Sequence, residues 1–196
     1  MFRETVSPEE IESFDLISFP GKIHVISSDK GPDYEYAVNY LNSQRIIGFD
    51  TETRPVFTPH TPRNKTALLQ LSGKDEAFLF RLNKMGLPKE VADIMADRTI
   101  TKVGAAVIDD IRGLCEHRRF AAGRFIDLQE LGSYYGIKEK SVRKMAAIIF
   151  GKKVSKKEQC SNWEASKLSD AQQQYAATDA WICLKMYKAL LASPTI

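Results

Sequence analysis

Two acidic side chains interrupt an apolar stretch and could form a carboxylate site. Asp50 and Glu52 lie two residues apart in the stretch that begins at Ile46, so in a strand they project from the same face. Neighbouring carboxylates on a buried strand repel each other unless cations or protons neutralise them. The same short pattern could also end a strand at a solvated edge, because so small a motif has many chance matches.

A third acid, Asp110, lies in the first turn of a predicted helix. It falls on that helix's apolar stripe, which is made by Val107, Ile111 and Leu114. Taken alone, it reads more simply as an acid favoured by the positive end of the helix dipole.

A fourth acid, Asp179, follows Tyr175 by one turn on a predicted C-terminal helix. The face that carries both continues with apolar residues, and Ser169 with Gln172 forms a capping box at the helix start. Taken alone, Tyr175 and Asp179 read as a boundary tyrosine beside a surface acid. Together, Asp50, Glu52, Asp110 and Asp179 would carry about four negative charges on inward faces, so the sequence predicts bound cations.

The ligand types indicate which cations and which chemistry. Carboxylate oxygens without histidine or cysteine favour Mg²⁺ or Mn²⁺ over zinc. Two such ions about 4 Å apart suit in-line phosphoryl displacement.

These side chains need a framework of strands and helices to hold them. Alternating, β-branched and aromatic runs predict strands at 22–26, 46–52, 67–71, 77–82, 101–105 and 125–128. Helical patterns are expected at 34–41, 88–97, 108–117, 128–135, 142–150 and 171–191, and a first helix with a Ser7–Glu10 capping box. Residues 54–63 hold three prolines and predict a loop. The order predicts an α/β fold, a mixed sheet covered by helices.

Composition narrows the class of protein. The 196 residues are 43% hydrophobic and 27% charged, which predicts a single globular domain over 1–196. A net charge of +3 gives no sign of a generic polyanion binder. Three separated cysteines argue against a disulfide scaffold or a structural zinc site. No stretch is apolar enough for a membrane span, and the charged start does not resemble a signal peptide, so a cytoplasmic protein is expected.

The ordered motifs resemble a known family. Gly48-Phe49-Asp50-Thr51-Glu52, then Val103-Gly104 with Asp110, then Tyr175-Ala176-Ala177-Thr178-Asp179 resemble the three motifs of the DEDDy 3′→5′ exonucleases. Within that family the chain is similar to ribonuclease D and to the Werner syndrome exonuclease domain, which Cys160-Ser161-Asn162-Trp163 also resembles. The resemblance covers about residues 40–192 and leaves 1–30 as an N-terminal extension.

The resemblance implies an RNase H-like fold with a mixed five-stranded sheet flanked by helices. It also implies two Mg²⁺ or Mn²⁺ ions: Asp50 would bridge both, Glu52 and Asp179 would hold the ion that activates water, and Asp110 would serve the second. Tyr175 would orient the attacking water. The substrate would be DNA or RNA with a free 3′ end, with DNA modestly favoured, and nucleoside 5′-monophosphates would be released.

Several residues are candidates for nucleic-acid contacts. Thr53 and Arg112 occupy positions where relatives carry bulkier side chains, and Arg54 and Phe57 follow in the proline loop. Ordinary loop packing is the simpler expectation for Phe57. Four lysines precede the last motif: Lys152, Lys153, Lys156 and Lys157. A solvated surface is the alternative for any such cluster. Trp163 and Asp127 are expected to be structural.

Other functions remain open at this point. The same fold could be a catalytically silent nucleic-acid-binding module, a ribonuclease D-like enzyme that processes RNA 3′ ends, or a protein-interaction scaffold. Duplex opening would require a partner such as a helicase or another processivity factor. The sequence makes no prediction of oligomeric state.

Overall fold

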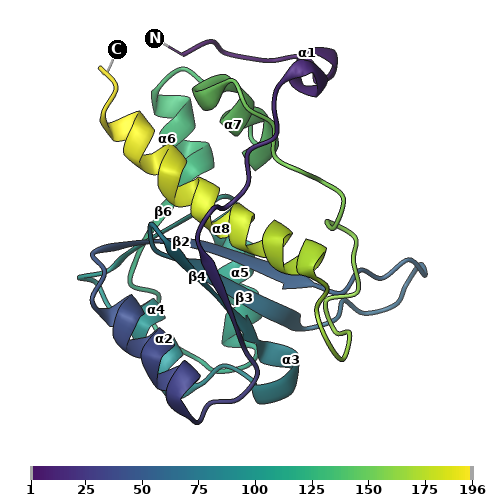
Figure 1. Ribbon diagram of the computed structural model, residues 1–196, viewed down its shortest axis with the longest axis vertical. Helices are drawn as coiled ribbons and strands as arrows, with labels where there is room; N and C mark the ends of the chain where they lie inside the picture. Colours follow the sequence, from purple (N-terminus) through teal and green to yellow (C-terminus); the bar gives the residue numbers. More distant parts are fainter. Residues whose placement is uncertain (1, 195–196) are drawn as a thin grey trace.

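Six strands form one mixed sheet in the computed structural model, which describes residues 2–194 (Figure 1). Their order across the sheet is β1-β4-β3-β2-β5-β6. The central β2, β3 and β4 are antiparallel, whereas β1, β5 and β6 each join a neighbour in parallel. The strands are β1 (Lys22–Ile26), β2 (Ile46–Thr53), β3 (Thr66–Ser72), β4 (Glu76–Arg81), β5 (Thr101–Gly104) and β6 (Arg124–Asp127).

The six strands match the six runs predicted from the residues, whereas the five strands implied by the resemblance are one too few. The strand β1 lies outside the range that the resemblance covers, and it pairs with the outer edge of β4, from Lys22 opposite Glu76 to Ile26 opposite Phe80. The segment 1–30 is therefore not an appendage, because its last part completes the sheet and covers an edge that would otherwise expose unpaired backbone groups.

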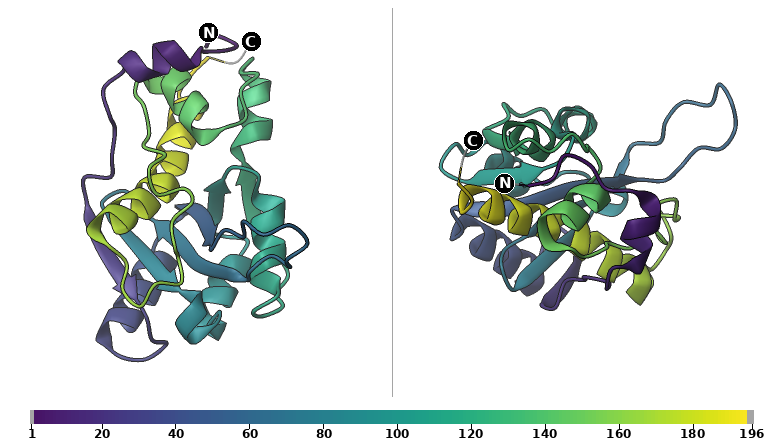
Figure 2. Two further views of the ribbon diagram at one scale, coloured as in Figure 1. Left: turned by 90° about the vertical axis from the view of Figure 1, so that its right-hand side faces the viewer. Right: turned by 90° about the horizontal axis from the view of Figure 1, so that it is seen from above.

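Helices cover both faces of the sheet. The long α8 crosses one face, and α2, α4 and α5 cover the other (Figures 1 and 2). The short α3 was not predicted, because its four residues directly follow the apolar run of β4. The helices are α1 (Pro8–Ser13), α2 (Pro32–Asn42), α3 (Leu82–Met85), α4 (Lys89–Ala96), α5 (Val107–Cys115), α6 (Leu128–Tyr134), α7 (Val142–Phe150) and α8 (Asp170–Leu191).

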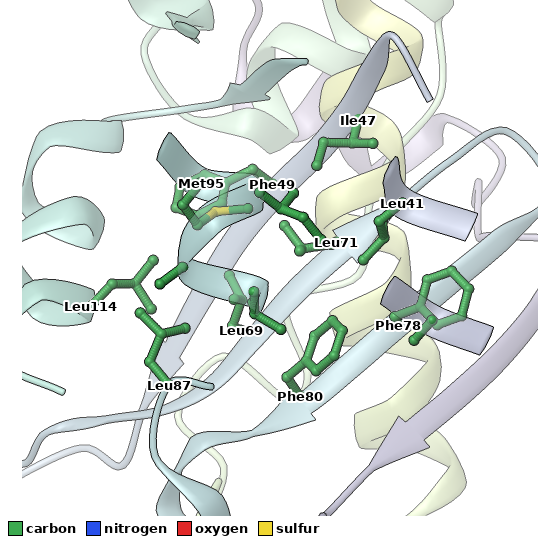
Figure 3. Packing of buried hydrophobic residues seen from close by; sticks show 14 of the residues in the cluster. Leu41, Ile47, Phe49, Leu69, Leu71, Phe78, Phe80, Leu87, Met95 and Leu114 are labelled. Atoms are coloured by element: carbon green, nitrogen blue, oxygen red, sulfur yellow. The ribbon is translucent and has the colours of Figure 1, made fainter. Parts of the chain in front are cut away.

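Alternation along β2 assigns its side chains to the two faces. Phe49 is fully buried in the core beneath α2, α4 and α5, so its neighbours Asp50 and Gly48 point toward α8. Figure 3 shows that core, in which strand residues meet helix residues Leu41, Met95 and Leu114.

Gly48 allows α8 to lie directly on β2. A Cβ atom at Gly48 would lie 1.9 Å from the carbonyl oxygen of Ala180, a distance no side chain tolerates. Since Asp179 immediately precedes Ala180, this close approach brings Asp179 to the same part of β2 as Asp50.

The N-terminal segment is anchored on α7 and α8. Ile11 of α1 packs against Ala147 of α7, and the Phe19 N–H donates to the Thr178 hydroxyl at 3.0 Å. The predicted capping box of α1 forms only in half. The Ser7 hydroxyl accepts from the Glu10 N–H, but the Glu10 carboxylate pairs with Arg3 at 2.5 Å instead of returning to the cap.

The loop 54–65 between β2 and β3 projects from the body of the molecule (Figure 2). Phe57 on this loop is 80% exposed, so the expectation that it packs within the loop is wrong. No helix within residues 2–194 has the length and apolarity that a membrane crossing requires.

Candidate active site

Three carboxylates meet between β2 and α8. Each of Asp50, Glu52 and Asp179 offers an oxygen atom, and these atoms lie within 4.8 Å of one another. Asp50 and Glu52 reach the site from the α8 face of β2, and Asp179 reaches it from the helix. The strand spacing and the helix face predicted from the sequence therefore converge in space.

Burial and mutual repulsion make these acids hard to ionise. Burial is the main cause of the raised pKa of each group: well above its ordinary value for Asp50, to about 10 for Glu52 and to about 7 for Asp179. The charges of neighbouring acids add to the rise at Asp50 and Glu52, while a hydrogen bond from Tyr175 partly opposes it at Asp179.

No ion pair within residues 2–194 joins these three acids to a basic side chain. No ion pair among the described residues therefore neutralises their charge. A set of half-buried or buried ligands that offers only oxygen atoms fits hard divalent cations.

The fourth acid, Asp110, lies beside this cluster rather than inside it. It comes from α5, on the opposite face of the sheet, and its Oδ1 accepts a 2.5 Å hydrogen bond from the Thr51 hydroxyl. Burial raises the pKa of Asp110 to about 6, although the Thr51 hydrogen bond opposes the rise. Thr51 thus links Asp110 to the strand that carries Asp50 and Glu52.

Asp127 fixes the turn that starts α5. Its carboxylate accepts the N–H groups of Ala106 and Val107 at 3.1 and 3.2 Å, and the N–H of Gln129 at the start of α6. Ala106 has a φ of 57°, which an L-residue adopts only when its surroundings hold it there. The structure thus gives Asp127 hydrogen bonds of the structural kind expected for it, and these also determine where Asp110 points.

Tyr175 lies one turn before Asp179 and shares its pocket. Its ring packs against Trp163 at 5.9 Å between centroids, and Trp163 is fully buried, as a structural residue would be. Burial, followed by the charges of Asp179 and Glu52, raises the pKa of the phenol above its ordinary value of 10. Tyr175 therefore keeps its proton at neutral pH and can donate a hydrogen bond.

Two pockets meet at Thr51. The first, here called the acid pocket, has a volume of about 320 Å³ and contains Asp50, Glu52, Tyr175 and Asp179. Its lining also includes Ser141, Val142, Arg143 and Lys156. The second, the arginine pocket, has a volume of about 500 Å³ and is lined by Asp110, Thr53, Arg54, Arg63 and Arg112.

The predicted nucleic-acid contacts fall into two groups. Thr53, Arg54 and Arg112 line the arginine pocket, and Lys156 lines the acid pocket. Phe57 lies on the projecting loop, and Lys157 lines a separate apolar pocket behind Tyr175.

Two of the predicted lysines are occupied by the N-terminal segment. Lys152 pairs with Asp15 at 2.8 Å, and Lys153 pairs with Glu12 at 3.4 Å while donating to its carbonyl oxygen at 2.7 Å. The structure therefore does not bring Lys152 and Lys153 to the carboxylates.

Sequence reasoning overlooked two residues of the site. Thr51 stands between the two motif acids, and its position beside both of them was the available signal. Arg143 was not among the residues predicted for the site, yet it lines the acid pocket. Arg143 lies in the first turn of α7, and the sequence does not show that this helix packs beside the site.

The chain is similar to known 3′-5′ exonucleases. A family model described as 3′-5′ exonuclease matches residues 25–193. The exonuclease 3′-5′ domain-containing protein 2 of Drosophila melanogaster is 30% identical over 177 residues, which cover 86% of this chain and 30% of that protein. The bifunctional 3′-5′ exonuclease/ATP-dependent helicase WRN of Mus musculus is 25% identical, covering 91% of this chain and 13% of that protein. The chain thus spans under a third of either relative.

A solved structure supports the architecture. Escherichia coli RNase D, an exoribonuclease involved in structured RNA processing, superposes with a TM-score of 0.76 at 23% identity, over 87% of this chain and 44% of that one. At this identity the likeness concerns the fold, and it confirms the expected RNase H-like arrangement.

Proposed function

The chain belongs to the 3′-5′ exonuclease family, and from this premise we propose that it removes nucleotides one at a time from the 3′ end of a polynucleotide. The products would be nucleoside 5′-monophosphates. The single observation that carries the proposal is the convergence of Asp50, Glu52 and Asp179 within 4.8 Å, with Tyr175 in the same pocket.

Divalent cations complete the proposed site. Asp50, Glu52 and Asp179 would hold Mg²⁺ or Mn²⁺, and Asp110 is near enough to raise the pKa of Asp50 by its charge. When bound, such ions supply a more acidic water and neutralise charge on the phosphate. The protein's own task is to hold the carboxylates at fixed positions, which the Gly48–Ala180 contact and the Thr51–Asp110 hydrogen bond support. The cations would favour the ionised form of these acids, whose raised pKa values otherwise oppose it.

Tyr175 would position the attacking water. The phenol is protonated at neutral pH because its pKa is raised, so it is unsuited to act as a general base. Its hydroxyl can instead donate or accept a hydrogen bond at a fixed place, since Trp163 packs against its ring.

The two pockets suggest a path for the strand. A polynucleotide that crosses Thr51 would pass from the arginine pocket to the acid pocket with its backbone beside the carboxylates. Arg63 would contact phosphates on that path. Arg54 and Arg112 could do so by exchanging their ion pairs with Glu164 and Asp109 for a phosphate. Phe57 on the projecting loop is free to stack on a base.

The choice between DNA and RNA is part of the proposal. The resemblance to the Werner-type domain favours DNA. The bacterial structural neighbour is an exoribonuclease, and analogy with it would favour RNA. We propose DNA as the preferred substrate. A helicase partner would follow only by analogy with the WRN relative, which is a bifunctional exonuclease and helicase.

Product analysis tests this function. DNA and RNA strands of the same sequence, labelled at the 5′ end, are incubated with Mg²⁺ and analysed for ladders and for released mononucleotides. The proposal predicts successive shortening from the 3′ end with nucleoside 5′-monophosphates as products, faster on DNA. Internal cleavage, 3′-monophosphate products or shortening from the 5′ end would contradict it.

A further inference from the structure

The lining of the acid pocket includes an arginine with no role so far. Arg143, on the second residue of α7, lines the same pocket as Asp50, Glu52 and Asp179. Its side chain is only 18% exposed, so its position is restricted. An arginine in the lining of a pocket that would accept a phosphate under the proposed function calls for an explanation.

Arg143 is held away from the carboxylates by a residue of the N-terminal helix. Its Nη2 donates to Glu12 of α1, and its Nε is buried without a hydrogen-bond partner among residues 2–194. Lys153 binds the same Glu12 through its carbonyl oxygen and its other carboxylate oxygen. The pair rests on apolar packing of Ile11 against Ala147, one turn after Arg143 on α7.

The arrangement separates opposite charges that would otherwise combine. An arginine free to move in this pocket would pair with Asp50 or Glu52 and displace cations from them. Glu12 provides a different counterion, so the guanidinium keeps its place and the carboxylates keep their ligand oxygens. A buried, unpaired N–H is costly, and such a group calls for a structural or functional reason.

We propose that Arg143 binds a phosphate of the polynucleotide substrate in the acid pocket, and that Glu12 of α1 positions it for this task. The inference rests on the proposed function for the identity of the substrate. The guanidinium is suited to the contact because it can give a phosphate two N–H groups in one plane. The N-terminal segment thereby becomes part of the substrate site, although it lies outside the motif-bearing region.

Binding without catalysis tests the assignment. The dissociation constant of a fluorescent single-stranded oligonucleotide is measured by anisotropy in EDTA over a range of salt concentrations. Arg143→Gln should weaken binding about tenfold, and it should lower the slope of log K against log salt by about 0.7, the value for one phosphate contact on a single strand. Arg143→Lys, which keeps the charge, should restore the slope. Arg3→Gln removes a charge of the same sign from the α1 region and should leave both quantities unchanged.

Glu12 gives the sharper comparison. Glu12→Gln makes the protein more positive, so long-range electrostatics alone predicts equal or tighter binding. The positioning role predicts weaker binding, by about threefold. Glu10→Gln makes the same charge change on the same helix, at a residue paired with Arg3, and should not weaken binding.

The outcomes are separable from those of the nuclease assay. Wild-type binding and slope in folded Arg143→Gln, or tighter binding in Glu12→Gln, would overturn the assignment. If Arg143→Gln does not fold, as judged by circular dichroism, Arg143→Lys and Glu12→Gln carry the test. Loss of binding in Arg143→Gln in a protein that cleaves nothing with Mg²⁺ would support Arg143 as a phosphate ligand while refuting the nuclease.

Discussion

Replacing Asp179 by asparagine should stabilise the metal-free protein while abolishing its activity. The pKa of Asp179 rises from 3.8 to about 7. Keeping the carboxylate ionised above that pH therefore costs the folded state about 4 kcal/mol, at about 1.4 kcal/mol per pH unit. Because Asp50 and Glu52 share the pocket and take up protons together with Asp179, we expect about half of that value.

The sign of the pH dependence follows from the raised pKa. The folded state binds the Asp179 proton more tightly than the unfolded state, so the cost is absent below about pH 4 and grows as the pH rises toward 7. Asparagine has no such cost. Asp179→Asn should therefore be more stable than the wild type by about 2 kcal/mol at about pH 8 in EDTA, or about 4–8 °C in Tm.

Thermal unfolding followed by circular dichroism in EDTA at about pH 5 and about pH 8 measures this difference. Asp93→Asn, an exposed acid paired with Lys89, is the matched control and should change Tm little. Mg²⁺ should raise the Tm of the wild type more than that of Asp179→Asn. A variant that is no more stable at about pH 8, or a difference equal at both pH values, would refute the reasoning.

Three further variants test the elements that position the site. Gly48→Ala places a methyl group on the Ala180 carbonyl. The free energy of unfolding should fall by about 3 kcal/mol or more, and activity should fall with it. An unchanged midpoint of urea or thermal unfolding would contradict that contact. Tyr175→Phe keeps the packing of the ring and should lower kcat about 10–100-fold with little change in KM or Tm; steady-state kinetics showing an unchanged kcat would remove the hydroxyl from the mechanism. Asp127→Ala removes three backbone hydrogen bonds and should cost about 2 kcal/mol, and calorimetry showing full stability would be the contrary result.

Most helices and strands could be predicted, because caps and the alternation of polar and apolar residues are local features of the sequence. The capping box of Ser169 with Gln172 starts α8 as expected, and the alternation in 22–26 matches β1. The predicted range 142–150 also matches α7, which the Ser141 side chain caps and Gly151 ends in a left-handed conformation.

Relations between distant elements were not readable in the same way. Asp110 lies on the inward stripe of its helix, but the sequence does not say which face of the sheet α5 covers, so its hydrogen bond to Thr51 could not be predicted. Lys152 and Lys153 were predicted to contact nucleic acid. Their ion pairs with Asp15 and Glu12 could not be foreseen, because these pairs join segments more than a hundred residues apart. The place of Arg143 in the acid pocket was not predicted, because it too depends on contacts between distant segments.

The central claim is that the cluster of Asp50, Glu52 and Asp179 performs metal-dependent 3′→5′ cleavage. The most direct test is a time course on a 5′-labelled single strand with Mg²⁺, with Mn²⁺ and with EDTA, using the wild type, Asp50→Asn and the control Asp93→Asn. The account predicts a ladder for the wild type and the control in either metal, none in EDTA, and none for folded Asp50→Asn. Cleavage by Asp50→Asn at the wild-type rate, or undiminished cleavage in EDTA, would contradict it.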